Sequence, residues 1–316
     1  MCASTSTPEI VRARNLHKNF GRTEALSGVN LSIQAGVIFA IVGPDAAGKT
    51  TLLRILSGVM RHDSGSLQVV GHEINSDPEN IKDRIGYLSQ RFSLNPVLTV
   101  EENIDFFASL YKVPRAERGL RMKRLLEFSR LGPFRKRQTA QLSGGMKQKL
   151  SLCCALVHTP ELLLLDEPTT GVDPISRREL WDILYDLLAE NVTIVLTTPY
   201  MDEAERATDI MLLHHGRDIA TGTLEELRSR FGFVVFELIA VDNRAAHRLL
   251  TERLGRQRVV FFGQKLHLIL DKSDDFAAVR SLLDDSGLAI ESALEISPGL
   301  EDIFIQDISG ENRGSA

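Results

Sequence analysis

Apolar and polar positions divide roughly the first 230 residues into buried strands separated by helices. Residues 37–42, 162–165 and 192–197 are continuous apolar or nearly apolar runs. Runs of this length without alternation are typical of parallel strands buried on both faces. Helical patterns cover residues 49–59 and most of the stretch from about 100 to 136. Strands that alternate with helices in this way predict an α/β core with a mainly parallel sheet.

The last part of the chain has a different order of elements. Alternating patterns predict strands over 233–241, 258–262, 266–270 and 289–296, and helices over 244–254 and 276–285. This β-α-β-β-α-β order matches a ferredoxin-like split unit. We therefore predict two domains, residues 9–230 with the α/β core and residues 233–310 with a small α+β fold. Residues 9–35 alternate as strands and turns that precede the core.

A glycine-rich loop follows the first buried strand and precedes a helix. It fits the phosphate-loop pattern G-x-x-x-x-G-K-[ST], and its residues are Gly43, Pro44, Asp45, Ala46, Ala47, Gly48, Lys49 and Thr50. Glycines let such a loop wrap closely, so that its N–H groups face phosphate oxygens. Lys49 adds a cation at the β- and γ-phosphates, and the Thr50 hydroxyl is a ligand for Mg²⁺. The loop predicts a nucleoside triphosphate site.

The second buried strand ends in two acidic residues, Asp166 and Glu167. Asp166 is expected to hold Mg²⁺ directly or through water, and Glu167 to polarise the attacking water as a general base. An acidic turn without a catalytic role is the alternative for such a pair. The phosphate loop upstream favours the catalytic interpretation.

A Ser-Gly-Gly segment, Ser143-Gly144-Gly145, begins a second helix that could bind an anion. A helix N-terminus presents unpaired N–H groups and the positive end of the helix dipole. The chain therefore carries two anion-binding elements, although a single nucleotide needs only one of them nearby.

Charge and cysteine content narrow the class of protein. The 316 residues carry a formal net charge of −5, which gives no electrostatic case for binding nucleic acid. No apolar run approaches the ~18 residues that span a bilayer, and the first eight residues lack the apolar segment of a signal peptide. Three cysteines, Cys2, Cys153 and Cys154, are too few and too badly spaced for a disulfide framework or a zinc site. These features predict a cytoplasmic, reduced protein.

With these motifs in place, the chain resembles the ATP-binding subunit of an ATP-binding cassette (ABC) transporter over about residues 9–230. Residues 142–148 match the signature motif of that family, its most specific sequence. The resemblance implies further nucleotide contacts, namely Gln90 at Mg²⁺ and water, Asp173 across the dimer interface, Phe20 on adenine, and Thr51 beside the phosphate-loop threonine. It implies a P-loop NTPase fold with a helical subdomain, and ATP with Mg²⁺ as ligands.

The family also implies partners. Two cassettes pack head to tail, and each ATP lies between the phosphate loop of one and Ser143, Gly144 and Gly145 of the other. That arrangement explains why one chain carries two anion-binding elements. Separate integral membrane permease subunits would handle a small-molecule substrate, with this chain peripheral on the inner face of the cell membrane. The C-terminal segment resembles the extra domain of drug and antibiotic export ATPases, so we expect an exporter of drugs, lipids or other hydrophobic compounds.

Pro199 departs from the family pattern. It stands after the third buried strand, where the family has a histidine that contacts the γ-phosphate. Proline has no side-chain donor and no backbone N–H, and losing one preorganised stabiliser typically costs ~10²–10³ in rate. One interpretation is that Glu167 suffices for hydrolysis, with Thr198 or a water filling in. The other is a heterodimer in which this chain's own site hydrolyses poorly while its signature motif completes a competent site on another cassette.

Two further classes of protein are alternatives to a transport ATPase. A soluble cassette that acts on ribosomes or DNA usually carries two cassettes or long insertions, and no room for an insertion is left between Lys49 and Ser143. An ATP sensor that does not hydrolyse is the second alternative, and Pro199 is the residue that favours it.

Overall fold

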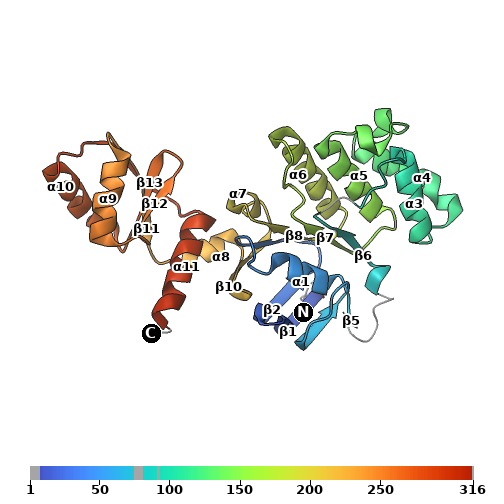
Figure 1. Cartoon of the computed structure of the whole chain (residues 1–316), viewed down its shortest axis with the longest axis horizontal. Coiled ribbons are helices and arrows are strands. Elements are labelled where there is room, and N and C mark those ends of the chain that lie inside the picture. The colour runs from blue at the N-terminus through green and yellow to red at the C-terminus, as the bar shows by residue number, and fades with distance from the viewer. Residues whose placement is uncertain (1–7, 75–80, 91–92, 315–316) are drawn as a thin grey trace, which may run out of the picture. The chain divides into compact units, whose positions relative to one another are not determined.

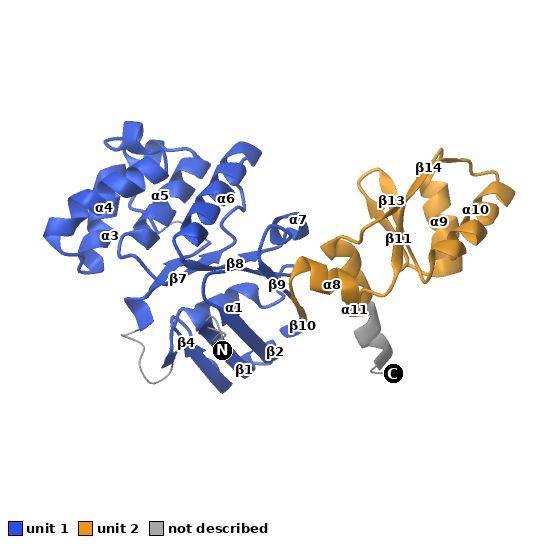
Figure 2. Cartoon of the chain, turned by 180° about the vertical axis from the view of Figure 1, so that it is seen from behind, with its two compact units in different colours: residues 1–218 blue, residues 219–316 orange. Residues whose placement is uncertain are grey.

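The computed structural model describes residues 8–74, 81–90 and 93–314. The chain divides into two compact units, residues 1–218 and 219–316 (Figure 1 and Figure 2). Residues 219–230 group with the second unit, whereas the sequence pattern assigned them to the first. The reason is that α8 (Leu224–Arg230) packs against α11 (Leu300–Gly314), and the Arg228 guanidinium donates a hydrogen bond of 2.8 Å to the Pro298 carbonyl. The predicted domain limits, 9–230 and 233–310, therefore remain a proposal.

A six-stranded sheet forms the centre of the first unit, in the order β10-β9-β3-β8-β7-β6, and its edge strand β10 contains the boundary between the units, after Asp218. Neighbouring strands from β9 to β6 run parallel. Its strands are β3 (Ile38–Val42), β6 (Ile85–Leu88), β7 (Leu162–Asp166), β8 (Thr193–Thr198), β9 (Asp209–His214) and β10 (Arg217–Gly222). Every residue of β3, β7 and β8 is buried, as their continuous apolar runs predicted.

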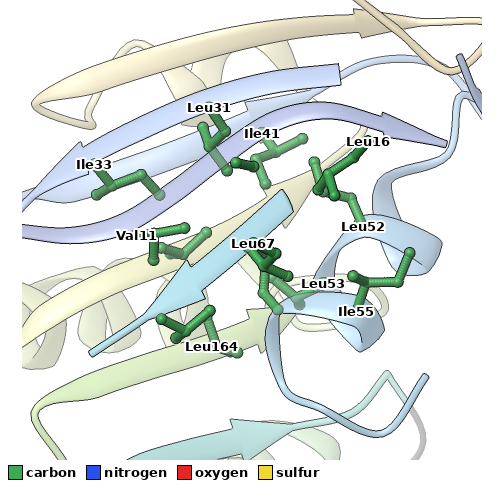
Figure 3. Close-up of a cluster of buried hydrophobic side chains, with 14 of the residues drawn as sticks. Val11, Leu16, Leu31, Ile33, Ile41, Leu52, Leu53, Ile55, Leu67 and Leu164 are labelled. Carbon is green, nitrogen blue, oxygen red and sulfur yellow. The ribbon is translucent and has the colours of Figure 1, made fainter. Parts of the chain in front are cut away.

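A second, antiparallel sheet of four strands lies beside the first, in the order β2-β1-β4-β5. Its strands are β1 (Glu9–Phe20), β2 (Thr23–Gln34), β4 (Ser64–Val69) and β5 (His72–Glu73). Apolar side chains of this sheet, such as Val11 and Leu67, meet Leu52 and Leu53 of α1 (Lys49–Leu56) and Leu164 of β7 in one core (Figure 3). This core fixes α1, and with it the end of the phosphate loop, between the two sheets.

Separate helices make up much of the rest of the first unit. They are α3 (Val100–Leu110), α4 (Arg115–Phe128), α5 (Gly144–Leu156), α6 (Pro174–Ala189) and the short α7 (Met201–Ala204), with 3₁₀ turns at Gly132–Phe134 and Thr139–Gln141. The stretch from 100 to 136 breaks before Pro114, which cannot lie within a continuous helix and occupies the N-cap position of α4 without a side-chain hydrogen bond. A capping box between Thr99 and Glu102 sets the start of α3.

The second unit contains the predicted ferredoxin-like order. Its sheet has the antiparallel order β12-β13-β11-β14, and its helices α9 and α10 follow β11 and β13 along the chain. The elements are β11 (Val234–Ala240), α9 (Asn243–Leu254), β12 (Val259–Phe262), β13 (Lys265–Leu270), α10 (Phe276–Asp285) after a 3₁₀ turn (Ser273–Asp275), and β14 (Ile290–Ile296). The predicted fold class, an α/β cassette core with a small α+β unit, is confirmed.

Within residues 8–74, 81–90 and 93–314, no helix combines the length and the apolar character needed to cross a membrane.

Candidate nucleotide site

The phosphate loop connects β3 to α1, and its glycines are required by close backbone neighbours. A Cβ on Gly43 would lie 2.0 Å from the Leu213 carbonyl oxygen, and one on Gly48 would lie 2.6 Å from that of Ala25. Gly48 also has φ of +107°, and Ala46 has φ of +64°, a left-handed conformation that is uncommon for alanine. Ala46 therefore adopts a backbone geometry that glycine would adopt without strain.

Lys49 folds back onto the first residues of the phosphate loop. Its ammonium donates to the carbonyl oxygens of Gly43 at 2.8 Å and Pro44 at 3.0 Å, and the residue is only 4% exposed. Main-chain carbonyls are weak partners for a buried cation compared with phosphate oxygens. The lysine is thus held at the mouth of the loop, where a triphosphate would offer it stronger acceptors.

The remaining residues predicted from the loop surround this centre. Ala47 is buried and donates its N–H to the Pro44 carbonyl at 3.2 Å, whereas Pro44 and Asp45 are exposed. Thr51 is partly buried in the first turn of α1.

Asp166 is fully buried and shares one oxygen between two hydroxyls. Thr50 Oγ1 and Thr197 Oγ1 each donate to Asp166 Oδ1 at 2.9 Å. The other oxygen, Oδ2, is buried without a hydrogen-bond partner. A buried carboxylate oxygen with no donor is costly, and a divalent cation beside it would remove that cost. Thr50, Asp166 and a triphosphate supply the oxygen ligands that Mg²⁺ prefers, so these residues fit the predicted metal.

Glu167 lies next to the lysine and the glutamine. Its Oε2 accepts from Gln90 Nε2 at 3.0 Å and from Thr170 Oγ1 at 3.3 Å, and its Oε1 is 3.5 Å from Lys49 Nζ. Glu167 has φ of +48°, which a glutamate rarely adopts. Strained backbone of this kind is concentrated at functional sites. The structure thus brings together the predicted general base, the predicted Gln90 and the phosphate-loop lysine.

Thr197 was not singled out from the sequence. Besides its bond to Asp166, its hydroxyl accepts the Glu167 N–H at 3.0 Å. The parallel register of β7 and β8 pairs Asp166 with Thr197. Its position at the carboxyl end of β8, the buried strand next to β7, was the sequence feature that could have identified it.

Phe20 ends β1 and is 49% exposed, with the Lys18 ammonium 5.7 Å from its ring centroid. It pairs with Thr23 across the turn to β2. Ala25, two residues further along β2, lies against Gly48 of the phosphate loop. An exposed ring on a strand end near the loop could stack on a nucleotide base.

The signature residues form a second cluster, at the N-termini of α5 and α6. Ser143 caps α5 by accepting the Met146 N–H at 3.3 Å, and Asp173 caps α6 through the N–H groups of Ile175 and Ser176. The Ser176 hydroxyl, followed by the N–H groups of Ser176 and Ile175, holds the pKa of the Asp173 carboxyl below its usual value.

The two glycines of this cluster differ in the space around them. A Cβ on Gly145 would lie 2.3 Å from Ser176 Oγ, whereas one on Gly144 would have its nearest neighbour, the Gly171 carbonyl oxygen, at 3.8 Å. Gly145 lets α5 approach α6 closely, and Gly144 leaves the helix N-terminus open.

Pro199 follows β8 directly and offers no polar side chain. The adjacent Thr198 is buried, and its hydroxyl accepts the Tyr200 N–H at 3.1 Å and donates to Glu203 at 3.1 Å. The Thr198 hydroxyl is therefore already engaged in two hydrogen bonds within the protein.

The chain is similar to ATP-binding proteins of transporters. A family model described as ABC transporter matches residues 26–170. The chain is 35% identical to the daunorubicin/doxorubicin resistance ATP-binding protein DrrA of Streptomyces peucetius, over 93% of this chain and 87% of that protein. It is 36% identical to the Nod factor export ATP-binding protein I of Ralstonia nicotianae, over 98% and 96%.

Another relative is longer. The probable multidrug ABC transporter ATP-binding protein YbhF of Escherichia coli is 38% identical over 95% of this chain, which spans about half, 52%, of YbhF. Among solved structures, an ATP-binding subunit of an ABC transporter matches with a TM-score of 0.65 at 30% identity, over 71% of this chain and 93% of that one. The dimeric post-hydrolysis cassette MJ0796, bound to ADP and Pi, matches with a TM-score of 0.62 at 28% identity, over 68% and 98%. With its phosphate loop, acidic strand end and signature helix, the chain belongs to the ATP-binding proteins of the ABC transporter family.

Proposed function

We propose that this chain binds ATP with Mg²⁺ and hydrolyses it, and that hydrolysis drives transport through membrane subunits on other chains. The observation that carries the proposal is the contact of Glu167 with both Lys49 and Gln90, beside the buried Asp166 oxygen that has no partner. A cation, a general base and a metal ligand are thereby gathered at the mouth of one phosphate loop.

The residues suggest a division of roles in the reaction. Lys49 would leave its carbonyl partners for the β- and γ-phosphate oxygens, and Thr50 and Asp166 would hold Mg²⁺. When bound, Mg²⁺ neutralises charge that develops on the phosphate oxygens. Glu167 accepts a proton from water, the water oxygen bonds to the γ-phosphorus, and the bond from that phosphorus to the bridging oxygen of ADP breaks. Gln90 donates to Glu167 and orients its carboxylate toward the water.

The site would be completed by a second cassette, a copy of this chain or a different one. The open N-terminus of α5 at Ser143 and Gly144 supports this, because it offers an anion site apart from the phosphate loop. The similarity to MJ0796, which was solved as a dimer, supports the same arrangement.

Export of a hydrophobic compound is the transport activity we propose. DrrA is named for daunorubicin and doxorubicin resistance and the Ralstonia nicotianae protein for Nod factor export. Both match over almost the whole of this chain, including its ferredoxin-like unit. The chain would sit on the inner face of the membrane, against separate permease subunits that choose the small-molecule substrate.

A second candidate function rests on Pro199. With proline in place of the γ-phosphate histidine and the Thr198 hydroxyl already engaged, this chain's own site would bind ATP and turn it over slowly. Its signature motif would then serve a faster site on a different cassette.

Phosphate release by the purified chain with Mg²⁺ and ATP tests the proposal. We expect release by the wild type and none by Glu167→Gln, while Glu167→Gln still binds a fluorescent ATP analogue. Wild-type protein that binds the analogue but releases no phosphate, alone or with its membrane partners, would support a non-hydrolysing role instead.

A further inference from the structure

Glu203, in α7, is a buried carboxylate outside the motifs that define the nucleotide site. The residue is 2% exposed, and its Oε2 accepts from Thr169 Oγ1 at 2.6 Å and from Thr198 Oγ1 at 3.1 Å. Its Oε1 lies 3.0 Å from the Nε atom of Arg177. A carboxylate so far from water is tolerated only with such partners.

The three partners come from three segments that surround the site. Thr198 ends β8 directly before Pro199, Thr169 lies two residues after Glu167, and Arg177 is in the first turns of α6. Glu203 thus connects the end of one strand, the turn after the predicted general base, and the helix that Asp173 caps.

The turn after Glu167 needs such support. Glu167 has φ of +48°, a strained conformation that persists only where its surroundings impose it. On one side its N–H is held by Thr197, and on the other Thr169 is anchored to Glu203. Fixing Thr169 fixes the backbone that aims the Glu167 carboxylate at Gln90 and Lys49.

Arg177 carries the connection to α6. Its guanidinium lies over the Tyr200 ring, 5.0 Å from the centroid, as well as beside Glu203. The segment around Pro199 is therefore tied to the helix whose N-terminus Asp173 caps. Neither Glu203 nor Arg177 is among the residues assigned to the nucleotide or the metal.

We propose that Glu203 is a positioning residue of the ATPase: it holds the strained turn at Glu167 and the start of α6 in fixed relation to the end of β8. The proposal rests on the hydrolytic function proposed above. It predicts that removing the charge of Glu203 slows the chemical step and leaves the phosphate loop, and hence ATP binding, unchanged.

Turnover by the full-length Glu203→Gln variant is the first test. We expect kcat to fall on the order of 10- to 100-fold while KM for ATP and the affinity for a fluorescent ATP analogue stay within about twofold of wild type. Asp202→Asn, which removes the same charge from an exposed neighbour in α7, should match wild type. Arg177→Gln should reduce kcat similarly, and the double variant no further, because both side chains act through one contact.

A second measurement does not need turnover. Amide hydrogen exchange of residues 167–173 in the nucleotide-free chain should become faster in Glu203→Gln and in Thr169→Val, with the central strands still protected.

Three results would overturn the proposal. They are a kcat of Glu203→Gln within about twofold of wild type, a loss of ATP affinity equal to the loss of kcat, or unchanged exchange of residues 167–173. If the wild type has no turnover, the proposed hydrolysis fails while the exchange measurement still decides whether Glu203 holds the turn.

Discussion

Lys49 Nζ lies 3.5 Å from Glu167 Oε1, so the predicted phosphate-binding cation is paired with the predicted general base. The two side chains are 4% and 10% exposed. Each charge therefore stabilises the other at a place that water hardly reaches. A triphosphate that attracts Lys49 would release the Glu167 carboxylate for a water molecule, which links nucleotide binding to activation of the base.

Replacing Lys49 with methionine should weaken ATP binding. Truncating one member of a buried charged contact costs about 2–5 kcal/mol, or at least about 30-fold in affinity. Titration with a fluorescent ATP analogue measures the change, and Lys136→Met, at an exposed lysine, is the matched control. Equal affinities for Lys49→Met and Lys136→Met would contradict the assigned role.

Gly145→Ala should destabilise the first unit, and Gly144→Ala should not. The added methyl at position 145 would lie 2.3 Å from Ser176 Oγ, whereas at position 144 the nearest atom is 3.8 Å away. Overpacking of this kind costs about 1–3 kcal/mol, against a change within about 0.5 kcal/mol for an open site. Urea denaturation compares the two variants directly, and similar midpoints would show that α5 and α6 are not closely packed at Gly145.

Pro199→His should increase turnover. An imidazole at this position would supply the missing stabiliser, so kcat should rise by about 10²-fold with KM little changed. Pro199→Ala, which removes the ring without adding a donor, should stay near wild type. If Pro199→His and Pro199→Ala hydrolyse ATP at the wild-type rate, a histidine is not what limits this site, and the second candidate function loses its support.

His158 should make stability depend on pH. Its Nε2 is 3.0 Å from the Ile85 carbonyl oxygen, its Nδ1 is buried without a hydrogen-bond partner, and its ring stacks on Tyr111 at 3.8 Å. Burial lowers the pKa of His158 below its ordinary value. The unfolded chain therefore binds a proton below about pH 6.5 that the folded chain resists, and the free energy of unfolding should fall as the pH drops.

Urea denaturation at pH 7.5 and 5.5 measures this dependence. The midpoint of wild type should decrease more over that interval than the midpoint of His158→Gln, whatever the stability of the variant at pH 7.5. Parallel decreases for the two proteins would mean that His158 takes up its proton in the folded state.

The sequence predicted those parts of the fold that depend on local pattern. The run at 37–42 became β3, and the helices expected at 244–254 and 276–285 became α9 and α10 with ends shifted by at most one residue. The phosphate loop could be predicted because its chemistry is contained in eight consecutive residues.

Other features depend on contacts between distant segments. Thr197 reaches Asp166 only through the register of two parallel strands, and Glu203 meets Thr169 and Arg177 only in the folded core. Single threonine, glutamate and arginine residues have no local pattern that distinguishes such partners from solvated ones. The grouping of residues 219–230 with the second unit likewise follows from the packing of α8 on α11, about 70 residues apart in the chain.

If the phosphate loop of one cassette works with the signature motif of another, two variants that disable different halves of the site should complement each other. Lys49→Met disables the first and Gly144→Asp, which the open space at Gly144 accommodates, places a negative charge on the second. Each variant alone should release no phosphate. Mixed in equal amounts, they should recover about a quarter of the wild-type rate, because half of the dimers then contain one intact site of two. No recovery from a mixture that still forms dimers with ATP would contradict the shared site.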